Sequence, residues 1–381
     1  MRRNRFESIP LAWLLAAVLA LALFGSALAQ DGQAEPAVGD AQTSIADGDF
    51  YLERGDCPLA QFFYQEALRA EPQNADAQVG KGRALSCQGA YAHAIEAFQA
   101  ALSADPNHLA AHVHLANTYQ NQYQSDPGAF SGRLADALDT IQRAERIDAN
   151  DARVQNTKGL VLYRLGEFEQ ARVTLERAVA LAADPGSTLT GEDRSTVQVN
   201  LGSVYRELGE FEMAQQAFRR AVVLDPASSS ARNNLGAVAF LLGDCDTAEF
   251  ELSQAVSLDP SSLAAASQLG ITLFECGQVA ASLPRLEHAV QMDGAIFFPP
   301  LFTYLARAYL EVGQVDEAVR RAQHGALLAD PESAEAYYWL GRAYQRRAGQ
   351  GDIDRARDAY RRALEVEPGY PEAQEALTQL P

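Results

Sequence analysis

The sequence has few basic side chains, and lysine is almost absent, since Lys81 and Lys158 are the only two. Its 31 basic residues face 50 acidic ones, which gives a formal net charge of −19. A chain with this excess of negative charge is repelled by nucleic-acid phosphates and by acidic lipid surfaces, so neither is expected as a partner. The charge either favours a basic protein partner or keeps an extended protein soluble, and the sequence leaves both open.

The motifs of common enzyme classes are also missing. The chain has no GxSxG nucleophile elbow, no GxxxxGK(S/T) phosphate loop and no GxGxxG loop. Its one histidine cluster, at His108, His112 and His114, is not accompanied by HExxH or by a close Cys–His spacing, so it does not predict a metal site. We expect no enzymatic activity, no cofactor and no bound metal.

Aromatic residues make up only 8% of the chain, whereas hydrophobic residues as a whole reach 48% and include many alanines. Long helices that pack closely through small side chains produce this balance. The composition therefore favours an all-α fold.

The N-terminus carries the pattern of an export signal. Arg2, Arg3 and Arg5 precede an uncharged apolar run from Leu11 to Phe24, and Ala27-Leu28-Ala29 is a small-x-small cleavage pattern. We expect residues 1–29 to be a signal peptide, cleaved after Ala29. The alternative is an uncleaved anchor over residues 11–29, because this segment approaches the ~20 residues that span a bilayer.

Both interpretations place the rest of the chain outside the cytoplasm, in the periplasm or the extracellular space. Contact with the membrane is expected only if the signal is uncleaved. Residues 30–40 have no periodic apolar face and are expected to form a flexible spacer.

Self-similarity with a period of 34 residues covers most of the chain and is clearest over residues 195–228. The recurring residues there, at positions 7, 8, 11, 15, 20, 24, 27 and 32 of the repeat, are Leu201, Gly202, Tyr205, Gly209, Ala214, Phe218, Ala221 and Pro226. This pattern resembles the tetratricopeptide-repeat family. Nine such repeats can be aligned, over residues 41–74, 75–108, 109–151, 152–185, 195–228, 229–262, 263–296, 299–332 and 334–370.

The resemblance implies an all-α solenoid in which pairs of antiparallel helices stack into a right-handed superhelix, with residues 371–381 as a C-terminal cap. Small residues at positions 8 and 20 let the two helices of a repeat approach, and glycine at position 15 gives the turn its backbone freedom. One helix pair cannot bury its apolar face alone, so the core forms only when the repeats stack.

The four cysteines occupy matching places in the repeat register. Cys57 and Cys245 begin second helices, whereas Cys87 and Cys276 end the first helices of the following repeats. Those helix ends are neighbours in a stacked solenoid. In an oxidising compartment this predicts the disulfides Cys57–Cys87 and Cys245–Cys276. The alternative is four unpaired cysteines that pack as small apolar side chains.

The family resemblance implies that ligands bind the concave surface lined by the first helices. Position 6 of those helices carries an amide in three successive repeats, at Asn200, Asn234 and Gln268, with Asn233 and Arg206 nearby. This row resembles the asparagine ladder of O-linked N-acetylglucosamine transferases. An amide can donate and accept, so it can pair with any peptide main chain. Ordinary polar surface is the alternative.

Two irregular segments are further candidates for partner contacts. The insertion at residues 120–133 is expected to place Tyr123 and Phe130 on a loop, and loops on rigid scaffolds often carry recognition. Phe297 and Phe298, between the seventh and eighth repeats, are expected to fill a gap in a bent stack. The second helices carry three arginine pairs, which are interpreted as solvated outer surface: Arg219–Arg220, Arg320–Arg321 and Arg361–Arg362.

The sequence thus predicts a non-catalytic scaffold of the cell envelope that binds a protein or peptide on its concave face. Two alternatives stay open. One is a structural or self-assembling envelope protein. The other is an assembly factor for secretion or polysaccharide-export machinery. Carbohydrate binding would need clustered aromatic residues on the concave face, and the sequence shows only scattered ones.

Overall fold

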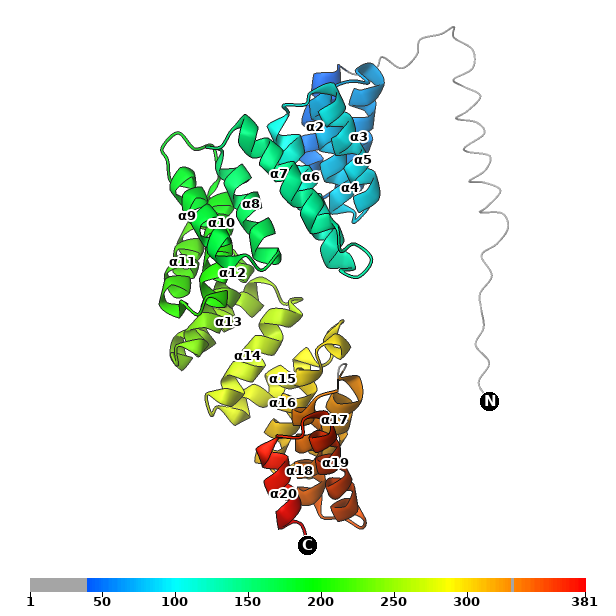
Figure 1. Cartoon of the computed structure of the whole chain (residues 1–381), viewed down its shortest axis with the longest axis vertical. Helices are drawn as coiled ribbons and strands as arrows, with labels where there is room; N and C mark the ends of the chain where they lie inside the picture. Colours follow the sequence, from blue (N-terminus) through cyan, green and yellow to red (C-terminus); the bar gives the residue numbers. More distant parts are fainter. Residues whose placement is uncertain (1–39, 330–331) are drawn as a thin grey trace, which may run out of the picture. The chain divides into compact units, whose positions relative to one another are not determined.

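The computed structural model describes residues 40–329 and 332–381, and all the regular secondary structure in this part is helical (Figure 1). The predicted signal peptide and residues 30–39 of the predicted spacer lie outside the described residues. Among the described helices, none combines the length and the apolar character that a membrane span requires. The chain divides into two compact units, and the boundary in the sequence falls between Ala129 and Phe130.

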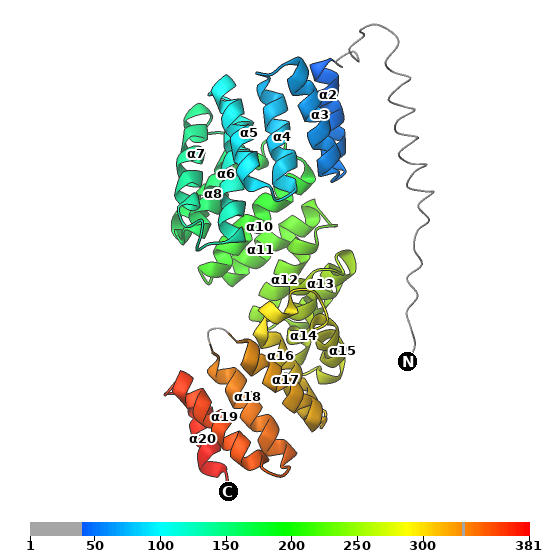
Figure 2. The same cartoon turned by 90° about the vertical axis from the view of Figure 1, so that its right-hand side faces the viewer.

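The described part of unit 1, from residue 40 on, contains five helices, and consecutive helices from α2 to α6 pack on one another (Figure 2). They are α2 (Ala41–Glu53), α3 (Cys57–Ala70), α4 (Ala75–Cys87), α5 (Tyr91–Ala104) and α6 (Leu109–Ser125). The first helices α2, α4 and α6 also contact one another in succession. Within residues 40–129, unit 1 therefore contains two complete helix pairs followed by the first helix of a third repeat.

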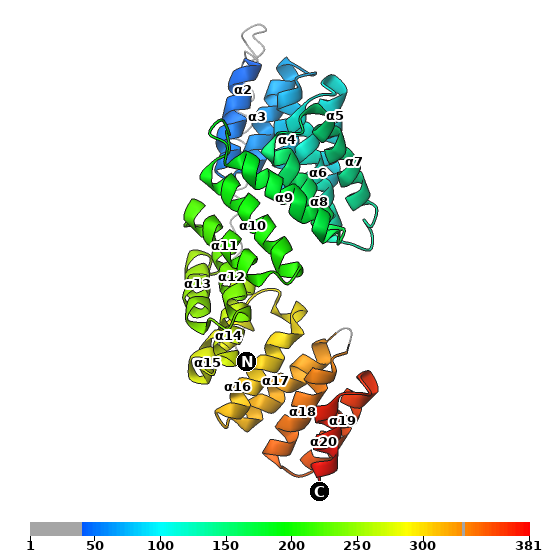
Figure 3. The same cartoon turned by 60° about the vertical axis from the view of Figure 1, so that its left-hand side comes forward.

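Unit 2 continues the alternation from α7 to α20 (Figure 3). Its helices are α7 (Arg133–Ile147), α8 (Ala152–Arg164), α9 (Phe168–Ala182), α10 (Gly191–Glu207), α11 (Phe211–Leu224), α12 (Ser229–Leu241), α13 (Cys245–Leu258), α14 (Leu263–Glu275), α15 (Val279–Ala289), α16 (Pro299–Glu311), α17 (Val315–Leu328), α18 (Ala334–Arg347), α19 (Asp352–Val366) and α20 (Pro371–Gln379). A 3-10 turn, η1 (Ala295–Phe297), precedes α16.

The helices of a pair approach closely where a glycine on the first helix faces a large side chain on the second. Gly202 of α10 faces Phe218 of α11, which is completely buried, and a β-carbon at Gly202 would lie 2.7 Å from the ring. In the next repeat Gly236 faces the buried Leu252 in the same way, at 2.6 Å. No larger residue fits at these glycines unless the opposing side chain moves.

Glycine also makes the turn between paired helices, for example at Gly209, whose φ is 76°. In the last repeat this place is taken by Ala348, with φ 51°, the one non-glycine residue at positive φ in the described part. The turn is held by Asp352, the first residue of α19, whose side chain is 1% exposed. Its carboxylate accepts hydrogen bonds from Arg347 Nε (2.7 Å), the Gly349 amide (2.9 Å) and Arg355 (3.0 Å).

The hydrogen bond from Arg347, with those from Gly349 and Arg355, holds the pKa of Asp352 well below its usual range. A folded pKa below the unfolded value means that the stabilisation is present above about pH 4, the unfolded pKa, and is lost as the pH falls toward the folded value. We expect Asp352→Asn to lower the free energy of unfolding by about 2 kcal/mol at pH 7.

Urea denaturation at pH 7 and pH 3 checks this prediction: the deficit of Asp352→Asn should shrink at pH 3, where the aspartate of the unfolded wild-type chain is largely protonated. Asp354→Asn is the matched control, because the Asp354 side chain is 79% exposed and should contribute little at either pH. A deficit of the same size at both pH values would contradict the assignment.

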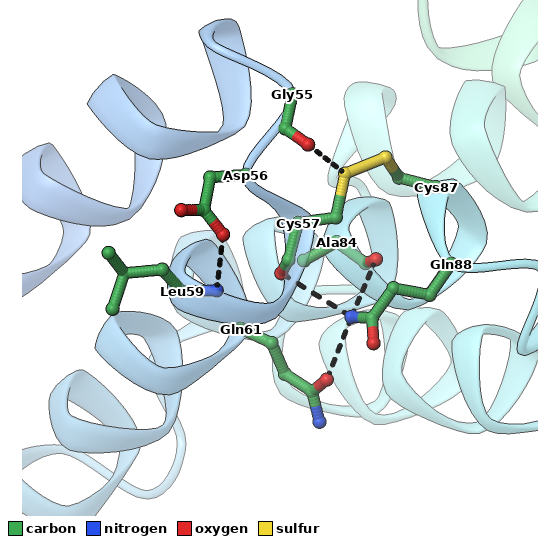
Figure 4. Close-up of a disulfide and its surroundings, with 8 residues drawn as sticks. All are labelled: Gly55, Asp56, Cys57, Leu59, Gln61, Ala84, Cys87 and Gln88. Atoms are coloured by element: carbon green, nitrogen blue, oxygen red, sulfur yellow. Dashed lines mark hydrogen bonds between the residues drawn. A yellow bond between two sulfur atoms is a disulfide. The ribbon is translucent and has the colours of Figure 1, made fainter.

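The structure joins the four cysteines as Cys57–Cys87 and Cys245–Cys276, with Cα atoms 6.1 Å apart in each pair. Figure 4 shows the first pair, which links the start of α3 to the end of α4. Gln88 Nε2 lies beside it and reaches the Cys57 carbonyl at 3.3 Å and Gln61 Oε1 at 2.9 Å. These are the pairs that the repeat register predicts, and each ties a repeat to the next one.

Candidate functional site

The first helices of unit 2 form a continuous layer, because α8, α10, α12, α14, α16 and α18 contact one another in succession as well as their own second helices. The side of this layer that carries position 6 of each repeat is called here the inner face. Its position-6 residues from α10 to α18 are Asn200, Asn234, Gln268, Tyr304 and Trp339, and α8 carries the buried Thr157 at this position. A partner lying along this face would meet one such side chain per repeat.

The three predicted amides lie on successive helices but are not equally available. Asn200 Nδ2 donates to Asn156 Oδ1 on α8 at 2.9 Å. Gln268 Nε2 donates to Thr272 on its own helix at 3.3 Å. Asn234 is engaged on both sides, since its Nδ2 donates to a backbone carbonyl of α12 and its Oδ1 accepts from Arg206 at 3.4 Å. Of the three, Asn234 is therefore the least able to reach a partner.

The residues predicted beside the ladder have different environments. Arg206 lies between repeats, where it contacts Asn234 and also pairs with Glu207 at 3.1 Å. Asn233 is half-buried, and its Oδ1 is buried without a hydrogen-bond partner among the described residues. The structure thus brings Arg206 onto the ladder, whereas the Asn233 oxygen is buried.

The loop predicted at residues 120–133 is shorter than expected. Helix α6 continues to Ser125, so Tyr123 lies on that helix and not on a loop, and it is half-buried. The prediction was wrong for Tyr123 because no residue between 120 and 125 breaks a helix, and the stop comes only before Pro127. Phe130 does lie on the loop that precedes α7, and it is also half-buried.

The expectation that Phe297 and Phe298 fill a gap is also wrong. Phe297 is 85% exposed and Phe298 is 37% exposed. Gly294, with φ 84°, turns the chain so that Ala295 is buried, and Leu301 at the start of α16 is completely buried. These two smaller side chains occupy the junction, and the phenylalanines face outward.

A cluster of aromatic rings around Arg307 is the main feature of the inner face that the sequence interpretation missed. The Arg307 guanidinium lies 4.7 Å from the ring centres of Phe274 and Tyr304 and 4.9 Å from that of Trp339. It also pairs with Glu275 at 3.0 Å. Burial, followed by the Glu275 carboxylate, raises the pKa of Tyr304, which therefore stays a neutral phenol at physiological pH.

Next to this cluster a hollow of about 670 Å³ opens between α16, α18 and α20. Trp339 and Tyr338 form part of its wall, and Arg342 lies 5.7 Å from the Trp339 ring. Its other charged lining residues are Glu311, Arg346, Glu372 and Glu375. The hollow therefore offers apolar contact together with charges of both signs.

The signal for this cluster was present in the sequence. Tyr304 and Trp339 occupy position 6 of the eighth and ninth repeats, and so continue the row that begins with the amides. The predicted ladder contains only the amides of this row, and the aromatic residues of the chain look scattered in the sequence. The structure shows that these aromatic residues are clustered. It gives no support to a carbohydrate site, because the Arg307 guanidinium lies over the rings of Phe274, Tyr304 and Trp339, on which a sugar would have to stack.

The clustered histidines have structural contacts. His108 accepts the Ala111 amide at the start of α6 and pairs with Asp76 at 2.9 Å. His112 contacts the Pro106 carbonyl at 3.0 Å, and His114 stacks on Phe98. In the part of the chain that the structure describes, no group of three or more His, Cys, Asp or Glu side chains could hold a metal ion.

These features define a tetratricopeptide-repeat protein: helices in pairs, large second-helix side chains packed against first-helix glycines, and a continuous layer of first helices. Proteins of this class are scaffolds that bind protein partners. Residues 46–108 match a tetratricopeptide-repeat model, and residues 129–380 match the model of the cilia and flagella-associated protein 70 C-terminal domain. The second match covers well over half of the chain, and the chain belongs to that family. The match coincides with unit 2.

Individual relatives are more distant. The chain is 27% identical over 139 residues to the protein CTR9 homolog of Arabidopsis thaliana, which covers 36% of this chain and 12% of that protein. It is 28% identical over 138 residues to the DnaJ homolog subfamily C member 7 homolog of Schizosaccharomyces pombe, over 34% of this chain and 29% of that protein. The matched region is therefore less than a third of either relative.

Among solved structures, the APC/C hetero-tetramer Cut9-Hcn1 is similar with a TM-score of 0.58 and 14% identity. The superposition covers 95% of this chain and 81% of that chain. At this identity the likeness shows the fold alone.

Proposed function

We propose that this protein is a non-catalytic scaffold that holds an extended segment of a partner protein along the inner face of unit 2, from Asn200 to Trp339. The observation that carries the proposal is the Arg307 cluster beside the 670 Å³ hollow. Tryptophan, tyrosine and arginine are the residues most enriched at the centres of protein interfaces, where a few side chains supply most of the binding energy.

The chemistry of the face favours a peptide. Amides at Asn200 and Gln268 can pair with main-chain groups, while the hollow at Trp339 can take an apolar or aromatic side chain. Three carboxylates, against two arginines, line the same hollow, and this excess of negative charge favours basic partner side chains, in agreement with the net charge of −19. The partner segment we propose is thus extended, with an apolar anchor and neighbouring basic residues.

The test is the affinity of a partner captured by the wild-type protein, measured again with inner-face variants. Trp339→Ala should weaken binding by about thirtyfold, the effect of removing an interface anchor, and the triple variant Asn200→Ala, Asn234→Ala, Gln268→Ala by about tenfold. Phe250→Ala is the matched control, because Phe250 lies on a second helix and is 58% exposed. Equal affinity of the wild type and of Trp339→Ala for the captured partner would contradict the proposal.

We also propose that the protein is exported from the cytoplasm, to the periplasm or the extracellular space. The two disulfides support this, because disulfides persist in oxidising compartments and are rare in the cytosol. The pattern of residues 1–29 supports it independently. Mass spectrometry of the protein from its native cells tests it: a mature chain that begins at Gln30, with all four cysteines oxidised, is expected. Reduced thiols on a chain that retains residues 1–29 would refute export.

The family match favours a second candidate, a scaffold of cilia or flagella. A scaffold of this kind inside the cytosol would keep its thiols reduced, so the same measurement separates the candidates. Self-assembly is a third outcome. In that case labelled protein would bind unlabelled copies of itself, and the Trp339→Ala substitution would not change this self-association.

A further inference from the structure

A second hollow, of about 460 Å³, opens between α9, α10 and α11 and is called here the α9–α11 hollow. Its apolar lining includes Val179 of α9 together with Val223 and Leu224 of α11. Val223 is 79% exposed. Covering such a surface with an apolar group is favourable in proportion to the apolar area that it removes from water.

This hollow is not part of the inner face. Gln198 of α10 lines it, and Asn200 of the inner face lies two residues further along the same helix. Two residues of an α-helix correspond to a rotation of about 200°, so the two side chains leave α10 on opposite sides. A ligand in the α9–α11 hollow and a ligand on the inner face would therefore not compete for the same side chains.

Three arginines line the hollow, at Arg194, Arg219 and Arg220, and no acidic residue does. None of the three has a salt bridge within the described residues, although the chain carries 50 acidic side chains and most of its other described arginines are paired. The sequence interpretation of Arg219–Arg220 as solvated outer surface overlooked that both border a concavity. The charge of the hollow is positive in a protein whose net charge is −19, which favours an anionic occupant.

Two side chains that line the hollow each carry a polar atom that is buried without a partner in the described part of the chain. One is Oε1 of Gln198, whose residue is only 7% exposed, and the other is Nε of Arg194. The first can accept a hydrogen bond and the second can donate one. Leaving such a buried group unpaired is unfavourable, so an occupant that supplies both a donor and an acceptor is favoured.

We infer that the α9–α11 hollow binds an extended segment of a partner protein in which an acidic side chain lies next to an aliphatic one. The peptide main chain supplies an N–H for Gln198 and a C=O for Arg194. The aliphatic side chain covers Val223, and the carboxylate pairs with Arg219 and Arg220. A fatty acid would satisfy the charge and the apolar wall, but it has no N–H for Gln198. The inference does not depend on the proposed inner-face site.

The experiment selects random dodecapeptides on the purified full chain and measures the affinity of the enriched peptides by fluorescence anisotropy. We expect an enriched class with aspartate or glutamate beside leucine, isoleucine or valine. The double variant Arg219→Glu, Arg220→Glu should bind this class about tenfold more weakly or worse. The charge-matched control is Arg146→Glu, Arg285→Glu, because both arginines are exposed and neither lines the hollow. This control should keep wild-type affinity.

Gln198→Leu separates binding from folding. It removes a buried, unpaired oxygen, so the fold should become more stable while peptide affinity falls. Three results would overturn the inference: enriched peptides without carboxylates, equal binding by the Arg219→Glu, Arg220→Glu variant, or displacement of the peptides by decanoate. Peptides whose affinity falls only in the Trp339→Ala variant bind the inner face and not the α9–α11 hollow. If no other class appears, the hollow is not a peptide site, and the inner-face proposal still stands.

Discussion

Replacing Phe218 with alanine is expected to lower the free energy of unfolding of unit 2 by about 4 kcal/mol. Phe218 is completely buried and packs against Gly202, with Leu201, Tyr205 and Leu235 in the same core cluster. Because glycine has no side chain that could move into the space, the cavity left by the ring cannot be refilled from α10. The loss should therefore lie in the upper part of the range for large-to-small substitutions.

Phe218→Leu is the matched comparison, because Leu175 and Leu252 occupy the same place in the neighbouring repeats, opposite Gly159 and Gly236. We expect it to cost about 1 kcal/mol. Guanidinium denaturation followed by circular dichroism measures both variants. Repeat arrays can unfold in segments, so the loss is read from the transition that contains α10 and α11. Similar losses for alanine and leucine would contradict this packing.

Removing the disulfide of unit 2 with Cys245→Ser and Cys276→Ser is expected to cost about 3–4 kcal/mol, the loop-entropy estimate for a loop of this size. The two cysteines are 31 residues apart in sequence and join the start of α13 to the end of α14. Thermal unfolding in the presence and absence of a reductant measures the effect. In the unfolding transition of unit 2, the wild type should fall to the level of the variant when it is reduced, and the variant should not change. The reductant should still affect unit 1 in both proteins, because both keep Cys57–Cys87.

The unit 1 disulfide provides an internal control. Cys57→Ser with Cys87→Ser should destabilise only unit 1 by a similar amount, and the two losses should add because the pairs share no partners. A wild-type protein whose unfolding does not change on reduction would show that the disulfides contribute no stability.

The repeat pattern predicted the helices well because each of its positions has one physical role. Gly202 is small because Phe218 lies opposite, and Gly209 is glycine because the turn needs positive φ, which glycine adopts without strain. The cysteine pairing followed from the same register. Where the pattern was interrupted, prediction failed. Tyr123 was assigned to a loop because the insertion was counted from the repeat period and not from helix breakers.

The binding surface was only partly predictable, because it depends on contacts between repeats. The sequence placed Asn200, Asn234 and Gln268 in one row, but it could not show that the Asn234 side-chain oxygen already accepts a hydrogen bond from Arg206. Likewise, Arg307 appears as an isolated charge in the sequence, and it becomes the centre of an aromatic cluster only when α14, α16 and α18 pack together.

The most direct test of the central claim is site-specific photocrosslinking in the cells that make the protein. A photoreactive phenylalanine analogue replaces Tyr304 on the inner face in one strain and the exposed Phe250 of α13 in another. The proposed function predicts that a discrete protein partner is crosslinked from Tyr304 and not from Phe250. Crosslinking from Phe250 alone, or from neither position in cells that contain the folded protein, would contradict a partner-binding inner face.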